Sequence, residues 1–114
     1  MATTYVRRFN LKDSLSDAEV IAHWKFMLEE FLPPVQRVSG VRSVKFYSGA
    51  GALRADLRIV AEIDDAGVYE RLLIDPEVRK LLGRFYGAVE LASSTQMFVR
   101  EVTPELIQAL SSAG

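Results

Sequence analysis

The sequence predicts one α+β domain in which strands and helices follow the order β-α-β-β-α-β and the strands form a four-stranded antiparallel sheet. Three observations support this prediction. Segments with period-two alternation are separated by two segments with helical periodicity. The composition, 49% hydrophobic and 25% charged residues, is that of a folded globular protein. The length of 114 residues suits a single domain, so residues 1–114 are assigned to it, including a short C-terminal tail helix.

The first quarter of the chain predicts a strand followed by an amphipathic helix. A strand is predicted over residues 5–12, because alternate residues there share one face: Tyr5, Arg7, Phe9 and Leu11. Ser16 or Asp17 is a suitable N-cap for a helix with an apolar stripe that runs through Leu32. Pro33-Pro34 is expected to stop or bend that helix, because neither proline has an N–H to donate.

A hairpin is predicted next. The segment Val41–Ser48 alternates in polarity, and Gly49-Ala50-Gly51 is typical of a turn rather than of a phosphate-binding loop. Leu53–Ile63 is the clearest strand in the chain, with one wholly apolar face. Its other face is mixed and carries Arg54, Asp56, Arg58, Val60 and Glu62.

The second half predicts a broken helix, a strand and a tail helix. Asp64-Asp65 begins a helical stripe that Asp75-Pro76 interrupts, and a second helix then runs to Gly87. Thr95–Val102 is predicted as the last strand, and Thr103-Pro104 caps the tail helix. In that strand we expect two residues to point towards the helices, Met97 and Val99, and three to point away, Phe98, Arg100 and Val102.

Charge and composition exclude several classes of function. The formal net charge is -1, so no overall basic field favours nucleic acid or anionic lipid. The absence of cysteine excludes disulfides, thiolate nucleophiles and zinc–thiolate sites. Because no apolar run approaches the roughly 20 residues that span a bilayer, we expect no membrane segment and a cytoplasmic location.

The element order is the split β-α-β plan of ferredoxin-like domains, in which the helices cover one face of the sheet. From Tyr5 to Val102 the chain resembles the dimeric α/β barrel superfamily, which includes antibiotic-biosynthesis-type monooxygenases and stress-responsive barrel proteins. The resemblance lies in the Gly40-Val41 strand start and in the helical break at Leu73-Ile74-Asp75-Pro76-Glu77-Val78. It implies a homodimer with sheets paired face to face, and a small ligand held between sheet and helices.

The mixed face of the third strand is the candidate dimer interface, formed by Arg54, Asp56, Arg58 and Val60. Alternating charges at this spacing describe a self-neutralising interface network. The same residues could instead bind a carboxylate, and the interface interpretation is preferred.

His23 is the only histidine and therefore the candidate catalytic base. It lies at the border of the first helix's apolar stripe, where a half-buried ring with its polar edge in water is the more common outcome. A base or a haem ligand is the alternative interpretation.

Large aromatic rings are the candidate substrate-binding residues: Trp24, Tyr47, Tyr69 and Tyr86. Together they would suit a small, flat aromatic ligand, whereas ordinary core packing is the alternative. A buried Trp24 indole N–H would need a partner or a ligand. The acidic clusters at Asp64-Asp65 and Asp75-Pro76-Glu77 are interpreted as helix starts, so we expect neither a metal nor a cofactor.

Two functions follow from these residues and from the resemblance. The first is a cofactor-independent oxygenase or isomerase of small aromatic or polyketide-like compounds. The Asn-and-Trp pairing expected of the related enzymes is not evident, since Asn10 is the only asparagine. The second is a non-catalytic dimeric binding or structural protein whose cavity is filled by its own side chains.

Overall fold

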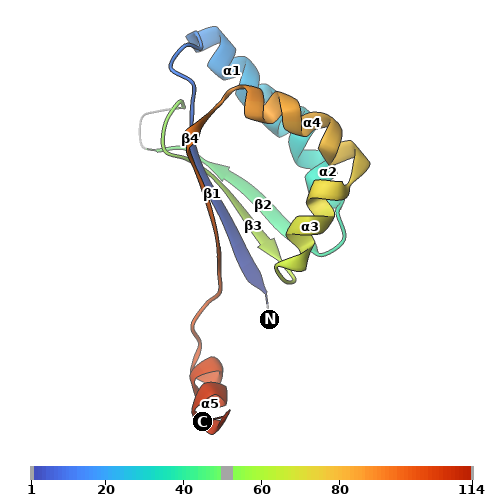
Figure 1. The fold of residues 1–114 in the computed structure, drawn as a ribbon, viewed down its shortest axis with the longest axis vertical. Coiled ribbons are helices and arrows are strands. Elements are labelled where there is room, and N and C mark those ends of the chain that lie inside the picture. The colour runs from blue at the N-terminus through green and yellow to red at the C-terminus, as the bar shows by residue number, and fades with distance from the viewer. Residues whose placement is uncertain (1, 50–52, 114) are drawn as a thin grey trace.

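Four strands form one antiparallel sheet in the computed structural model, which describes residues 2–49 and 53–113. They are β1 (Thr3–Leu11), β2 (Val41–Tyr47), β3 (Leu57–Ile63) and β4 (Val89–Val99), in the spatial order β2-β3-β1-β4. The helices that precede β4 all lie on one side of the sheet, as Figure 1 shows. The predicted α+β class and element order are therefore confirmed, and the other side of the sheet is left as a bare face.

The first helical segment continues through Pro33-Pro34, where we expected it to stop or bend. It consists of α1 (Asp17–Phe26), a π-helical turn η1 (Met27–Phe31) and α2 (Leu32–Arg37). Of the two N-caps predicted, Ser16 and Asp17, it is Ser16 that caps α1 and forms a capping box, in which Ser16 and Glu19 each bond the other's backbone N–H. Pro33 and Pro34 lie in the first turn of α2, where a missing N–H costs little, and the π-helical turn precedes them.

The second helical segment is broken as predicted. Helix α3 (Gly67–Ile74) ends at Asp75, and α4 (Pro76–Gly87) begins directly after it. The Asp75 carboxylate accepts hydrogen bonds from the backbone N–H groups of Glu77 and Val78, at 3.0 and 3.1 Å. Asp75 therefore ends one helix and caps the next.

Strand β3 is shorter than predicted, because the chain bends through residues 53–56 before the strand begins at Leu57. Asp56 has a φ of +55°, a left-handed conformation that cannot continue a strand. The side chain of Asn10 accepts a hydrogen bond from the Asp56 N–H at 2.8 Å and holds this bend against β1. The turn expected at Gly49-Ala50-Gly51 falls largely outside the described residues.

The last strand begins at Val89, earlier than the predicted start at Thr95, and its side chains point to the opposite sides of the sheet from those expected. In β4, Phe98 pairs with Tyr5 and Met97 pairs with Val6. Directly paired residues point to the same side of a sheet, and Tyr5 is buried beneath the helices. The assignment of Met97 and Val99 to the helix side was therefore wrong: Phe98 faces the helices, while Met97 and Val99 lie on the bare face.

The hydrophobic core lies between the sheet and the helices. Leu57 of β3, Val68 of α3 and Val89 of β4 have no exposed surface. Phe9 meets Phe85 edge-on with ring centroids 5.4 Å apart, and Phe31 stacks on Phe85 at 5.1 Å. These contacts fix the helical layer on one face of the sheet.

The tail helix α5 (Pro104–Ala113) was also predicted, and Figure 1 shows it extended beyond the end of β4, away from the other helices. Thr103 caps it by accepting a hydrogen bond from the Leu106 N–H at 3.1 Å. Ile107 and Leu110 are both more than half exposed on it.

Candidate functional site

A cavity of about 70 Å³ lies between the sheet and the helices. Most of its wall is apolar and comes from both layers, including Val44, Ile59, Leu72 and Leu82. Among the described residues that line it, Arg7 of β1 is the one charged residue, and Tyr5, Tyr69 and Tyr86 supply the phenol groups. The cavity therefore has the composition of a small-molecule site, which is mostly apolar with a few polar groups.

The guanidinium of Arg7 is held by four neutral acceptors. Its Nε donates to the Tyr5 Oη at 2.9 Å, and its Nη1 donates to the Ser94 Oγ at 2.7 Å. Its Nη2 donates to the Gln96 Oε1 at 2.6 Å and to the Tyr69 Oη at 3.3 Å. Since these partners come from β1, α3 and β4, three elements position one cation.

No carboxylate in the described part of the chain forms an ion pair with Arg7. Burial raises the pKa of Tyr5, although the neighbouring Arg7 opposes that shift. Burial also raises the pKa of Tyr86, again against the effect of Arg7. Because both phenols stay neutral at pH 7, the Arg7 cluster carries a net positive charge inside a largely apolar wall.

Two of the predicted substrate-binding tyrosines meet in this cavity. The Tyr69 ring packs against Tyr5 and Phe98, with centroids 5.2 and 5.8 Å apart. The ring of Tyr86 lies 5.6 Å from the Arg7 guanidinium carbon, within the range of a cation–π contact.

The other two predicted rings are placed elsewhere. Trp24 is absent from the cavity wall, packs against Phe46, and donates its indole N–H to the Leu53 carbonyl at 2.7 Å. Trp24 is only partly buried, and a backbone carbonyl satisfies its indole N–H. Tyr47 pairs with Arg58 and lies on the bare face of the sheet, opposite the cavity.

His23 is more deeply buried than expected and also lies outside the cavity wall. It is 7% exposed, and its ring centroid lies 5.6 Å from Phe26 and 6.0 Å from Phe85. Its Nε2 is buried without a hydrogen-bond partner in the described structure, and the ring as a whole is buried rather than half-buried as expected. Burial lowers the pKa of His23, and the positive charge of Arg84 lowers it further.

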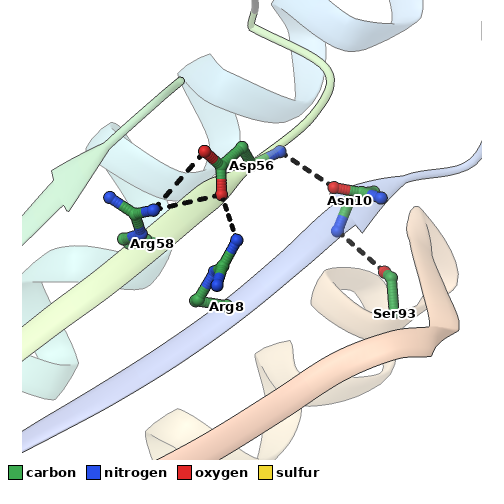
Figure 2. Close-up of polar contacts among 5 residues, drawn as sticks. All are labelled: Arg8, Asn10, Asp56, Arg58 and Ser93. Carbon is green, nitrogen blue, oxygen red and sulfur yellow. Dashed lines mark hydrogen bonds and ion pairs between the residues drawn. The ribbon is translucent and has the colours of Figure 1, made fainter. Parts of the chain in front are cut away.

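Three of the four predicted interface residues contribute to the bare face. Asp56 accepts hydrogen bonds from Arg8 at 2.7 Å and from Arg58 at 3.2 Å, and Figure 2 shows its carboxylate between the two guanidinium groups. Val60 belongs to the same face, two residues beyond Arg58. Arg54 instead donates hydrogen bonds to the Leu15 carbonyl at 2.8 Å and to the Asp17 carboxylate at 2.9 Å. It therefore connects the bend that precedes β3 to the start of α1.

Sequence reasoning placed Arg7 on the same face of the first strand as Tyr5, Phe9 and Leu11 but gave it no functional role. The available signal was a charged residue at one of the alternating positions that otherwise held Tyr5, Phe9 and Leu11. Ser94 and Gln96 could not have been found in this way, because they reach Arg7 only through the pairing of β1 with β4.

No three potential metal-ligating side chains lie together among residues 2–49 and 53–113. Within the same ranges, no helix has the length and apolar character needed to cross a membrane.

Solved structures share this fold at low sequence identity. A dimeric protein of unknown function with a ferredoxin-like fold, from Bacteroides fragilis, has a TM-score of 0.71 and 14% identity, covering 88% of this chain and 96% of its own. An antibiotic biosynthesis monooxygenase has a TM-score of 0.69 and 8% identity, covering 90% of this chain and 100% of its own.

A third similar structure is SnoaB, a cofactor-independent oxygenase from Streptomyces nogalater, with a TM-score of 0.65 and 15% identity. It covers 90% of this chain and 97% of its own. No protein-family model matches the chain, and no curated protein matches it in sequence. The chain therefore has the ferredoxin-like fold that these monooxygenase-type and dimeric proteins share.

Proposed function

We propose that this chain is a homodimeric small-molecule-binding protein whose ligand occupies the helix–sheet cavity. The observation that carries the proposal is the cavity wall, in which apolar side chains of both layers surround Arg7, Tyr69 and Tyr86. Such a wall excludes water from most of a ligand and leaves a few polar groups to orient it.

The chemistry that we propose for this site is cofactor-independent oxygenation of a small aromatic or polyketide-like compound. The substrate would lose a proton from a CH2 group that is conjugated with a carbonyl, as in an anthrone, and supply its own electrons to dioxygen. One oxygen atom would enter the substrate as a new carbonyl, and the other would leave as water with the two hydrogens of the CH2 group. The similarity in fold to SnoaB, a cofactor-independent oxygenase, supports this reaction class.

The size of the cavity favours small substrates or side-chain movement on binding. Ligand sites commonly measure about 300–1,000 Å³, whereas this cavity measures about 70 Å³. Leu73, a wall residue on α3, is 38% exposed and therefore lies where the cavity meets solvent. A rotation of Leu73 alone would enlarge the space and leave Tyr69 in contact with Arg7.

The test is oxygen uptake with anthrone-like substrates under air, measured for the unaltered protein and for Tyr69→Phe and Tyr86→Phe. Tyr47→Phe is the matched control, because it removes the same hydroxyl from the opposite face of the sheet. Turnover that falls in the two cavity variants but not in the control is expected. Turnover that is absent, or unchanged in both cavity variants, would contradict the oxygenase proposal.

The small cavity also favours a second candidate, a non-catalytic dimeric binding or structural protein. In that case the wall side chains themselves fill most of the space, and no substrate turns over. Native mass spectrometry distinguishes ligand binding from a purely structural role, since a discrete mass lost on denaturation identifies a bound molecule.

We further propose that the bare face of the sheet forms the homodimer. The proteins of similar fold from Bacteroides fragilis and Thermobifida fusca are described as dimeric. In this chain Val60 lies between Glu62 and the ion pairs of Asp56 with Arg8 and Arg58. Met97 and Val99 add exposed apolar surface from β4. An apolar centre with charged residues around it is the usual composition of a protein interface.

A further inference from the structure

We infer that Arg7 is the anchor for a planar anionic oxygen group of the ligand, either a carboxylate or an ionised phenol or enol. This inference rests on the proposed cavity binding and goes further by naming the ligand's charge. It would make the site selective for compact anions over neutral molecules of the same shape.

The first argument is the uncompensated charge. Arg7 lines the cavity, and its hydrogen-bond partners are the neutral groups of Tyr5, Tyr69, Ser94 and Gln96. A guanidinium that is partly removed from water is normally paired with a carboxylate or phosphate. In the described structure Arg7 has no such partner, so a ligand anion would supply the missing charge.

The second argument is the number of donors. A guanidinium has five N–H groups, and the four contacts of Arg7 use one on Nε, one on Nη1 and two on Nη2. One N–H of Nη1 is therefore left without an acceptor among the described residues. The contact from Nη2 to the Tyr69 hydroxyl is the longest of the four, at 3.3 Å, and is the one that a ligand oxygen would most easily replace.

The third argument is preorganisation. Three hydrogen bonds of 2.6 to 2.9 Å hold the guanidinium plane, and the Tyr86 ring lies against it. A cation fixed in this way loses little freedom when an anion arrives, so more of the interaction energy appears as affinity. Tyr69, whose hydroxyl is within reach of Arg7, is placed to donate its O–H to the same anion.

The experiment compares benzoate with benzamide, which have nearly the same shape and differ in charge. Binding is followed by NMR, using the Arg7 Nε–H and the ring signals of Tyr69 and Tyr86. Acetate and acetamide repeat the comparison with a pair small enough for the cavity at its present volume. We expect each anion to bind at least about tenfold more tightly than its neutral partner, as charge-assisted hydrogen bonds do.

Variants separate the role of Arg7 from a general effect of charge. Arg7→Gln is expected to abolish the preference for the anion, whereas Arg7→Lys keeps the charge, loses the planar fork and retains part of the preference. Arg42→Gln is the matched control, since it removes the same charge from an exposed arginine that pairs with Asp64 and does not line the cavity. The lysine variant also keeps the test decisive if the glutamine variant does not fold.

The outcomes distinguish this inference from the proposed function on which it rests. Equal binding of anion and amide in the cavity would overturn the Arg7 inference and leave cavity binding standing. An unchanged preference in a folded Arg7→Gln or Arg7→Lys protein would also overturn it. Failure of all four probes to shift the cavity signals would overturn the proposed cavity binding itself.

Discussion

Tyr5 and Phe98 pack ring against ring beneath the helices, with their centroids 5.4 Å apart. This contact sets the facing of β4, because the neighbours of Phe98 along the strand must point the other way. Met97 and Val99 consequently join Val6 and Val60 on the bare face, and this apolar surface is available to a partner.

A charge placed on that surface is expected to weaken the proposed dimer. Val60→Asp or Arg58→Glu would bury an unpaired carboxylate, which costs about 3–5 kcal/mol and raises the dimer Kd by roughly 100-fold or more. Analytical ultracentrifugation over a range of concentrations measures this change. Leu28→Asp is the control, since Leu28 is 52% exposed on the helical side of the molecule. A dimer that tolerates both bare-face variants at micromolar concentration would place the interface elsewhere.

The buried ring of His23 predicts that stability falls in mild acid. Burial lowers the folded-state pKa of His23 below the value of about 6.5 for an exposed histidine. Below pH 6.5 the unfolded chain therefore takes up a proton that the folded chain resists, and the free energy of unfolding decreases as the pH falls towards the folded-state pKa. Above that window His23 is neutral in both states and contributes no pH dependence.

Urea unfolding between pH 8 and pH 5 tests this prediction. His23→Leu removes the titrating ring and is expected to flatten the pH dependence over that interval. The same slope in the unaltered protein and in His23→Leu would show that other groups control acid stability.

Gly40 and Gly83 form a matched pair for alanine substitution. Gly40 has a φ of +94°, and a Cβ there would lie 2.6 Å from the Val68 Cγ2. Gly40→Ala is therefore expected to destabilise the fold by about 1–3 kcal/mol, from backbone strain and the clash. At Gly83, inside α4, a Cβ would meet nothing within 4 Å. Gly83→Ala is expected to stabilise the protein by about 1 kcal/mol, because alanine favours helix. The midpoints of thermal and urea unfolding should thus fall for Gly40→Ala and rise for Gly83→Ala.

Removal of the Asp75 cap is expected to lower the free energy of unfolding by a modest amount. Asp75→Ala removes the acceptor for two backbone N–H groups at the start of α4 and should destabilise the protein by about 1 kcal/mol. Asp75→Asn, which keeps an acceptor oxygen, is expected to recover most of this loss in urea unfolding. An alanine variant as stable as the unaltered protein would mean that the break between α3 and α4 does not depend on this cap.

Local patterns in the sequence were enough for the element order, the start of α1 at Ser16 or Asp17, the break at Asp75 and the tail helix. Each of these features depends on residues close together in the chain, such as a cap and the N–H groups one turn later. Period-two spacing also grouped Tyr5, Arg7, Phe9 and Leu11 on one face of β1, although it did not say which face the helices cover. The facing predicted for β4 was wrong, since a shift of one residue moves every side chain to the opposite face and the register of β4 depends on its pairing with β1.

The candidate site was likewise predicted in part from the sequence and in part decided by the tertiary structure. Period-two spacing determined that Arg7 and Tyr5 share a face of β1, and helical spacing identified the stripe that carries Tyr69, whereas Tyr86 was singled out only as a large aromatic ring. Only the tertiary structure decided that these rings converge on Arg7, that Trp24 bonds the Leu53 carbonyl, and that His23 is buried outside the cavity. The physical reason is that these contacts join residues far apart in the chain, and packing alone determines which distant side chains meet.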